Sequence, residues 1–153
     1  MRFFEHIIRI GGPGIDRAGV GEELLEYARH PERYVPGLSK TTIDEESVDG
    51  NRTTLRRTTR FGTDYVFRET VTIDHNEALE VATAAGSNHP ASRHIVRIEE
   101  PEAGALFLRF IYDQDTTAEA DPRIDSLRRD AYAAKDQDVV ARMLERLIAR
   151  IGR

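Results

Sequence analysis

One pair of oppositely charged side chains could form a binding or catalytic element if two strands bring it together. Arg57 and Glu69 lie on either side of a turn signal at Gly62-Thr63-Asp64. A three-residue loop would pair Phe61 with Tyr65 and Arg57 with Glu69, whereas a two-residue loop is the competing register. We favour the three-residue loop because it collects the apolar residues of both strands on one face. On that face the pair either neutralises itself as a structural ion pair or orients the polar group of a ligand.

A second hairpin, over residues 92–114, places a histidine and a tyrosine on an otherwise apolar face. The expected cross-strand pairs are Ile98 with Leu106, Val96 with Leu108 and His94 with Phe110. His94 could act as a general acid or base because an unperturbed histidine titrates near neutral pH. The alternative is a hydrogen-bonded core histidine, and the same two interpretations apply to His6 on the first strand. Tyr112 completes the polar groups of this face.

Several classes of site are excluded by the sequence. The chain has no cysteine, which rules out disulfides, thiol nucleophiles and cysteine–zinc sites. Its five histidines show no metal-ligand spacing. The glycines at 12–14 match neither a dinucleotide-binding fingerprint nor a phosphate-binding loop, and no serine lies in a nucleophile elbow. We therefore expect no metal and no cofactor, and the sequence favours a binding protein over an enzyme.

These side chains must be positioned by a sheet, because most of the chain alternates between apolar and polar residues. A first strand over residues 2–10 is followed by a short helix that begins after Asp16 and ends at His30-Pro31, with a brief second turn at 31–34. Six further strands, separated by five turn signals, predict an antiparallel meander. They are expected over residues 38–48, 52–61, 65–73, 78–84, 92–100 and 105–114.

A long C-terminal helix is predicted from Asp121 as the N-cap and Pro122 at the first helical position to about Ile151. Its second half carries an apolar stripe expected to pack on the sheet, whereas its first half is richer in alanine. The stripe consists of Val140, Met143, Leu144, Leu147, Ile148 and Ile151. A curved sheet with an apolar concave face needs a cover, and this helix is the only element long enough to provide it.

Length and composition limit the classes of protein that remain. A chain of 153 residues predicts one domain over 1–153, large enough to bury a sizeable core. The net charge of −5 disfavours a nucleic-acid binder, and no apolar tract is long enough for a membrane span. A cytoplasmic location is the default expectation without a signal peptide. We leave open a homodimer.

Four stretches resemble the AtaL-like family of the START and pollen-allergen-like (SRPBCC) superfamily. They are FEH at 4–6, PERYVPGL at 31–38, IEEPEAGALFLRFIY at 98–112 and AYAAKD at 131–136. The resemblance implies a helix-grip fold of class α+β. In that fold a seven-stranded curved antiparallel sheet wraps around a long C-terminal helix, and a cavity lies between the sheet and this helix. One or two short helices follow the first strand. Relatives often carry a large aromatic residue near the position where this chain has Gly21. The smaller residue either opens space or is compensated by repacking.

The superfamily includes lipid carriers, hormone receptors and polyketide aromatase/cyclases, so the resemblance implies a function only as a class. We expect a cavity of a few hundred Å³ that binds a small hydrophobic or aromatic molecule. The alternatives are a polyketide cyclase-like enzyme that uses the same cavity and a protein-interaction module without a functional pocket. The predicted ligand-binding residues are Arg57, Tyr65, Phe67, Glu69, His94, Leu108, Phe110 and Tyr112.

Overall fold

The computed structural model describes residues 1–87, 89–115 and 121–152, and one antiparallel sheet forms its framework. The spatial order of the seven strands is β1-β7-β6-β5-β4-β3-β2, so only β1 leaves the order of a simple meander. It pairs with β7, which places the N-terminal strand beside the last one. The strands are β1 (Arg2–Arg9), β2 (Leu38–Asp49), β3 (Arg52–Phe61), β4 (Tyr65–Asp74), β5 (Ala78–Thr83), β6 (Ser92–Glu102) and β7 (Ala105–Gln114).

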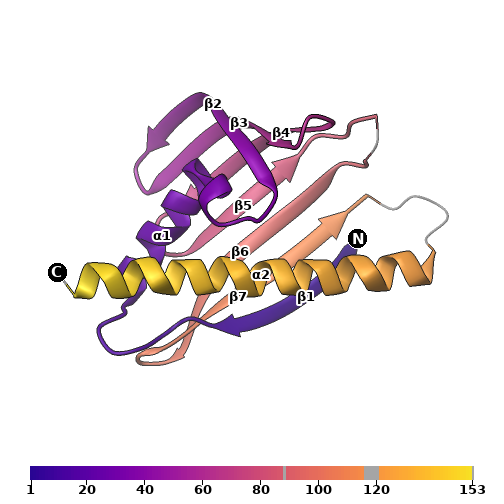
Figure 1. Ribbon diagram of the computed structural model, residues 1–153. Coiled ribbons are helices and arrows are strands. Elements are labelled where there is room, and N and C mark those ends of the chain that lie inside the picture. The colour runs from indigo at the N-terminus through magenta and orange to yellow at the C-terminus, as the bar shows by residue number, and fades with distance from the viewer. Residues whose placement is uncertain (88, 116–120, 153) are drawn as a thin grey trace.

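Three helical segments complete the fold: α1 (Arg17–Arg29), the 3-10 turn η1 (Pro31–Arg33) and α2 (Pro122–Ile151). The side chain of Asp16 caps α1 by accepting from the backbone N–H of Gly19, and Asp121 caps α2 in the same manner. Helix α2 crosses the sheet with α1 beside its C-terminal half (Figure 1). This arrangement confirms the α+β helix-grip fold that the sequence predicts.

The β3–β4 register confirms the three-residue loop, since Phe61 pairs with Tyr65 and Arg57 with Glu69. The register predicted for β6–β7 is wrong by two residues: His94 pairs with Tyr112 rather than with Phe110. The tight turn that pairs Glu102 with Ala105 displaces the register by three residues, and the extra β6 residue between Glu99 and Glu102 brings the shift back to two. Because the shift is an even number of residues, every side chain keeps its predicted face.

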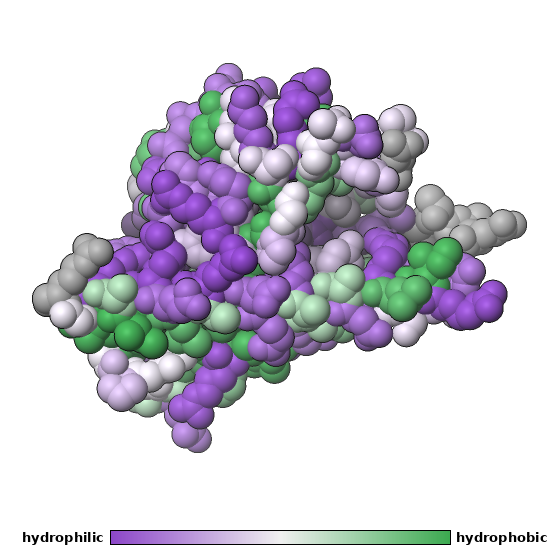
Figure 2. All heavy atoms as spheres, viewed as in Figure 1, coloured by the Kyte–Doolittle hydropathy of each residue, from purple (hydrophilic) through white to green (hydrophobic). Residues whose placement is uncertain are grey.

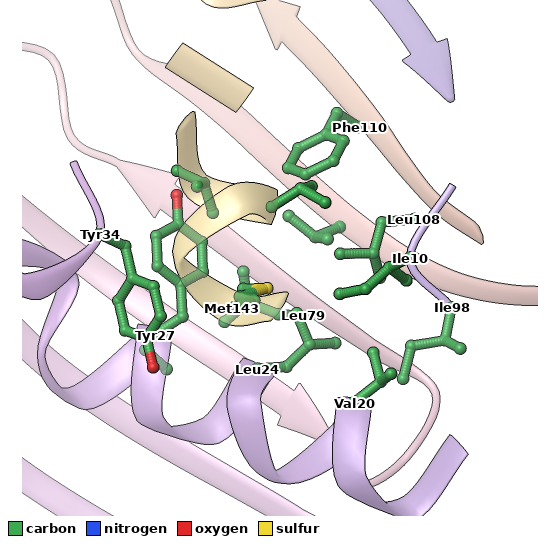
Figure 3. Close-up of a cluster of buried hydrophobic side chains, with 14 of the residues drawn as sticks. Ile10, Val20, Leu24, Tyr27, Tyr34, Leu79, Ile98, Leu108, Phe110 and Met143 are labelled. Carbon is green, nitrogen blue, oxygen red and sulfur yellow. The ribbon is translucent and has the colours of Figure 1, made fainter. Parts of the chain in front are cut away.

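The core is concentrated where α1 and the second half of α2 (residues 136–151) face the sheet (Figure 3). Val139, Val140, Met143 and Leu147 are the apolar residues of α2 that are buried there. The predicted stripe is therefore partly wrong, because Ile148 and Ile151 are 61% and 49% exposed and Leu144 is half-buried. The face that meets the sheet runs through Val139 instead. In Figure 2 apolar residues accordingly reach the surface near both ends of α2.

Gly21 gives α1 close contact with the β4–β5 turn. A Cβ atom at this position would lie 2.1 Å from Oδ1 of Asn76, so the space is repacked rather than opened. Arg17 holds the same turn by donating to the Asn76 carbonyl oxygen at 2.8 Å. Helix α1 and the β4–β5 turn are thus held in direct contact. Among the described residues, no helix has both the length and the apolar character needed to cross a lipid bilayer.

Candidate functional site

A pocket of about 340 Å³ lies between the sheet, α1 with η1, and the first half of α2 (residues 122–135). Most of its wall is aromatic or aliphatic. The aromatic and histidine residues that line it are Phe3, Tyr27, Phe61, Phe67, His89, His94, Tyr112 and Tyr132. The charged residues that line it are Arg57, Glu69, Arg93, Asp113, Arg128 and Lys135. The volume agrees with the few hundred Å³ expected from the sequence.

The first half of α2 reaches the pocket with polar and aromatic side chains rather than with aliphatic ones. Arg128, Tyr132 and Lys135 all line the pocket, and their spacing of four and three residues places them on one face of the helix. The guanidinium groups of Arg128 and Arg129 lie 4.3 and 4.7 Å from the ring centre of Phe3. These cation–π contacts attach the half-helix to β1.

The Arg57–Glu69 pair forms a satisfied polar network in the pocket wall. Arg57 Nε donates to Glu69 Oε1 at 2.9 Å, and a second guanidinium nitrogen donates to the carbonyl oxygen of Ala28 at 2.5 Å. The hydroxyl groups of Thr59 and Thr83 each donate to Glu69 at 3.2 Å. The exposed fractions of the Arg57 and Glu69 side chains are 7% and 13%. The pair therefore couples three strands to α1 and is structural as well as pocket-lining.

Three rings form a continuous stack from the sheet to α2. His94 on β6 stacks on Tyr112 of β7, with ring centres 4.3 Å apart and planes inclined by 15°. Tyr112 stacks in turn on Tyr132 of α2, at 4.3 Å and 5°. The ammonium group of Lys135 lies 4.9 Å from the ring centre of Tyr112. The stack joins the first half of α2 to the sheet, and all three of its residues line the pocket.

A buried carboxylate fixes the middle ring of this stack. Asp136 is fully buried on α2 and accepts from the Tyr112 hydroxyl and from His6 Nε2, both at 2.6 Å. Burial, followed by the negative charge of Asp136, raises the pKa of Tyr112 well above its ordinary value, so the phenol stays protonated and donates. Lys135 Nζ lies 3.6 Å from the same carboxylate. His6 is thus a hydrogen-bonded histidine, which is the second of the two interpretations that the sequence left open.

The ionisation of His94 is set by its position in the wall. Burial lowers the pKa of His94 well below its ordinary value, and the positive charges of Lys135 and Arg57 add to this effect. The imidazole is therefore neutral at neutral pH. His94, Arg57 and Lys135 all line the pocket, which therefore gathers ionisable groups from β3, β6 and α2.

The structure places the eight predicted ligand-binding residues in three different environments. Arg57, Phe67, Glu69, His94 and Tyr112 line the pocket. Leu108 and Phe110 are fully buried in the core and lie behind the pocket wall rather than on it. Tyr65 is 53% exposed at the tip of the β3–β4 hairpin and does not line the pocket. Whether any of these residues binds a ligand stays a prediction.

Sequence reasoning missed the contribution of the helices, chiefly Tyr27 of α1 and Tyr132 and Lys135 of α2. The sequence contains one signal for the α2 residues. The apolar stripe at Met143 and Val139 continues toward the N-terminus at helical spacing through Asp136, Tyr132 and Arg128. Arg128 and Arg129, which the pattern alone assigns to a solvated face, instead contact Phe3.

Within residues 1–87, 89–115 and 121–152, no group of three or more His, Cys, Asp or Glu side chains could hold a metal ion.

Solved structures share this fold at low sequence identity. The 18 kDa protein CC1736 from Caulobacter crescentus matches with a TM-score of 0.69 and 17% identity, covering 98% of this chain and 99% of that chain. A START superfamily protein from Mycobacterium smegmatis matches with a TM-score of 0.61 and 10% identity, covering 95% and 97%.

The di-domain ARO/CYC StfQ from the steffimycin biosynthetic pathway matches with a TM-score of 0.69 and 15% identity. The match covers 98% of this chain and 52% of StfQ, so the chain spans about half the length of that protein. A comparison with curated protein sequences finds no match. The profile of the family described as "AtaL: Acetylaranotin biosynthesis cluster protein L" matches residues 12–149. This match covers most of the chain and shows that the chain belongs to the AtaL family.

Proposed function

We propose that this protein binds a small hydrophobic or aromatic molecule in the pocket between its sheet and the first half of α2. The observation that carries the proposal is the pocket itself: about 340 Å³, lined mainly by aromatic and aliphatic side chains and a few polar groups. Ligand sites in proteins typically combine these properties at volumes of about 300–1,000 Å³. The aromatic side chains that line the pocket favour an aromatic molecule.

The polar groups of the pocket have unequal freedom to meet a ligand. Arg57 and Glu69 are engaged with each other and with the backbone or neighbouring threonines, so we expect them to shape the wall. Lys135 is the freer cation, because Asp136 already accepts short bonds from Tyr112 and His6. A ligand with one polar or anionic end would therefore place that end toward Lys135. Phe67, His94 and Tyr112 would contact its apolar body, with Leu108 and Phe110 supporting them from the core.

The similar proteins and the family are compatible with this proposal. StfQ is described as an ARO/CYC of a biosynthetic pathway, and the M. smegmatis protein as a START superfamily member. The description of the AtaL family refers to a protein of the acetylaranotin biosynthesis cluster. From these similarities and the pocket together, we infer that the protein handles a biosynthetic small molecule.

Two substitutions on β6 test the pocket directly. Ser92 lines the pocket, whereas Arg97 alternates to the opposite face of the same strand and is exposed. The folded wild-type protein should raise the fluorescence of the naphthalene dye ANS. Ser92→Phe should weaken that binding at least tenfold by filling the pocket, and Arg97→Phe should not. Equal binding by all three proteins, or none by the wild type, would contradict the proposal and favour a protein-interaction module.

A second candidate function is a polyketide cyclase-like enzyme, and the presence of His94, Lys135 and Arg57 in the lining of one pocket favours it. A neutral imidazole beside two cations can accept a proton from an acidic C–H while the cations stabilise the resulting enolate. Native mass spectrometry of protein from its own host should first identify the retained molecule. Turnover of that molecule, lost in His94→Phe with binding retained, would establish the enzyme; unchanged recovery of it would leave the binding protein.

A further inference from the structure

One buried polar atom of the pocket wall has no partner, and its chemistry indicates what it could bind. Nε2 of His94 is inaccessible to solvent and has no hydrogen-bond partner among the described residues. The nearby carboxylates are paired: Glu69, in the pocket wall, accepts three hydrogen bonds from other side chains, and Asp136, which holds Tyr112 of the wall, accepts two. A buried polar group without a partner is costly, so its retention in a pocket points to a missing partner.

The chemistry of Nε2 follows from the partner of the other ring nitrogen. Nδ1 of His94 lies 3.3 Å from the carbonyl oxygen of Ile111, and a carbonyl oxygen can only accept. The proton of the neutral ring therefore resides on Nδ1, which leaves Nε2 with a lone pair. Protonation of Nε2 is opposed by burial and by the nearby charges of Lys135 and Arg57. His94 thus offers the pocket a fixed hydrogen-bond acceptor.

The ring is also held in place. Tyr112 stacks on it with a ring-centre distance of 4.3 Å, and Asp136 fixes the hydroxyl of Tyr112 at 2.6 Å. Phe110 lies nearly parallel to it, at 6.1 Å and 17°. An acceptor that cannot turn away imposes a requirement on the ligand.

Building on the proposed function, we propose that His94 selects the ligand of this pocket by accepting a hydrogen bond at Nε2 from a hydroxyl group on a planar aromatic molecule. The ammonium group of Lys135 compensates the negative charge that the hydroxyl oxygen gains. Such hydroxyl groups are phenols or enols, which are stronger donors than alcohols. A ligand with an ether in place of the hydroxyl leaves the acceptor unpaired and is disfavoured.

The test compares 2-naphthol with 2-methoxynaphthalene by isothermal titration calorimetry. The two probes share their ring system, and only the first can donate. Wild type should bind 2-naphthol about tenfold more tightly, the upper range for one net hydrogen bond. His94→Phe keeps an aromatic ring in the stack and should abolish this preference while it still binds both probes. Lys135→Met should reduce the preference without abolishing it.

His89→Phe is the matched control, because His89 is the other histidine that lines the pocket and its Nδ1 also approaches a carbonyl oxygen, that of Pro90. This variant should retain the preference for 2-naphthol. Loss of the preference in His89→Phe instead of His94→Phe would overturn the assignment. Equal binding of the two probes by wild type would also overturn it, showing that Nε2 makes no bond to the ligand while the pocket still binds aromatic molecules. Failure of both probes to bind would overturn the proposed function together with this inference.

A stability measurement distinguishes selection from a structural role. If the acceptor is unpaired without ligand, His94→Phe removes that cost and should raise the thermal midpoint or leave it unchanged. A clear fall in the midpoint would show that the imidazole stabilises the fold and would count against the inference.

Discussion

The two halves of α2 belong to one uninterrupted helix of 30 residues but meet the sheet in different ways. The second half buries Val139, Val140, Met143 and Leu147 against α1 and the sheet. The first half buries no aliphatic side chain, and its Ile124 and Leu127 are 56% and 69% exposed. It contacts the sheet instead through stacked rings and guanidinium groups.

This difference shows how one element can both stabilise the protein and leave space beneath it. Close-packed aliphatic side chains leave few voids, so the second half closes the core. Glu23, a buried carboxylate of α1, strengthens that half by accepting from Arg146 of α2 and from the Tyr34 hydroxyl, both at 2.9 Å. Flat rings and long polar side chains fill space less completely, and the pocket lies under the first half.

The largest effect is expected at the polar network of the pocket half. Glu69→Ala should lower the free energy of unfolding by about 3–5 kcal/mol, because it leaves Arg57 buried without its carboxylate. Replacing both residues by leucine should recover much of this loss. Urea denaturation of the three proteins measures both effects.

Glu80→Ala is the control for that measurement, since Glu80 pairs with Arg93 on the surface. An exposed pair of this kind contributes about 0–1 kcal/mol. A Glu69→Ala variant as stable as Glu80→Ala would mean that Arg57 is solvated, and the pocket wall would then be less rigid than described.

The next effect separates the two halves of the helix. Met143→Ala should cost about 2–5 kcal/mol, the range for truncations of fully buried side chains. Leu127→Ala, in the first half, should change stability by less than about 0.5 kcal/mol because its side chain is exposed. Thermal unfolding followed by circular dichroism gives both values, and comparable losses would show that the first half is packed like the second.

A smaller effect should appear in the pH dependence of stability. Burial lowers the native pKa of His94, so below about pH 6.5 the unfolded chain binds a proton that the native protein does not. The free energy of unfolding contributed by this residue should therefore fall as the pH drops below about 6.5 and stay constant above it. The difference between wild type and His94→Phe, measured from pH 8 to 5, isolates this term because the other four histidines are common to both. A difference that does not vary with pH would show that His94 is solvated.

The fold and the β3–β4 register could be predicted because both depend on local patterns. Alternation of apolar residues fixes which face Arg57 and Glu69 occupy. Only the register with the three-residue loop places the apolar residues of both strands on that same face. The same alternation cannot detect a shift of two residues, which is why the β6–β7 pairing was wrong while its faces were correct. The bulge that reduces the shift from three residues to two has no clear sequence signature.

The site was predicted less completely than the fold, because its decisive contacts join residues far apart in the chain. Asp136 lies in the run Lys135-Asp136-Gln137-Asp138, which is typical of a solvated helix face. Only the three-dimensional arrangement brings it to His6, 130 residues away, and to Tyr112. Tyr65, in contrast, has the right alternation but lies at a hairpin tip that no helix covers.

The smallest expected effect concerns the local stability of α2 and sharpens the comparison between its halves. Amide hydrogen exchange should be faster over residues 122–135 than over 139–147, because the first half buries less apolar surface. Phe3 is the main sheet residue that the arginines of this half contact, at 4.3 and 4.7 Å. Two cation–π contacts of about 0.5–1 kcal/mol each predict that Phe3→Ala speeds exchange in the first half roughly tenfold and leaves 139–147 unchanged. Arg123→Ala is the control, since its side chain is 94% exposed on the same half. Uniform exchange along the whole helix would show that α2 opens as one unit rather than in two halves.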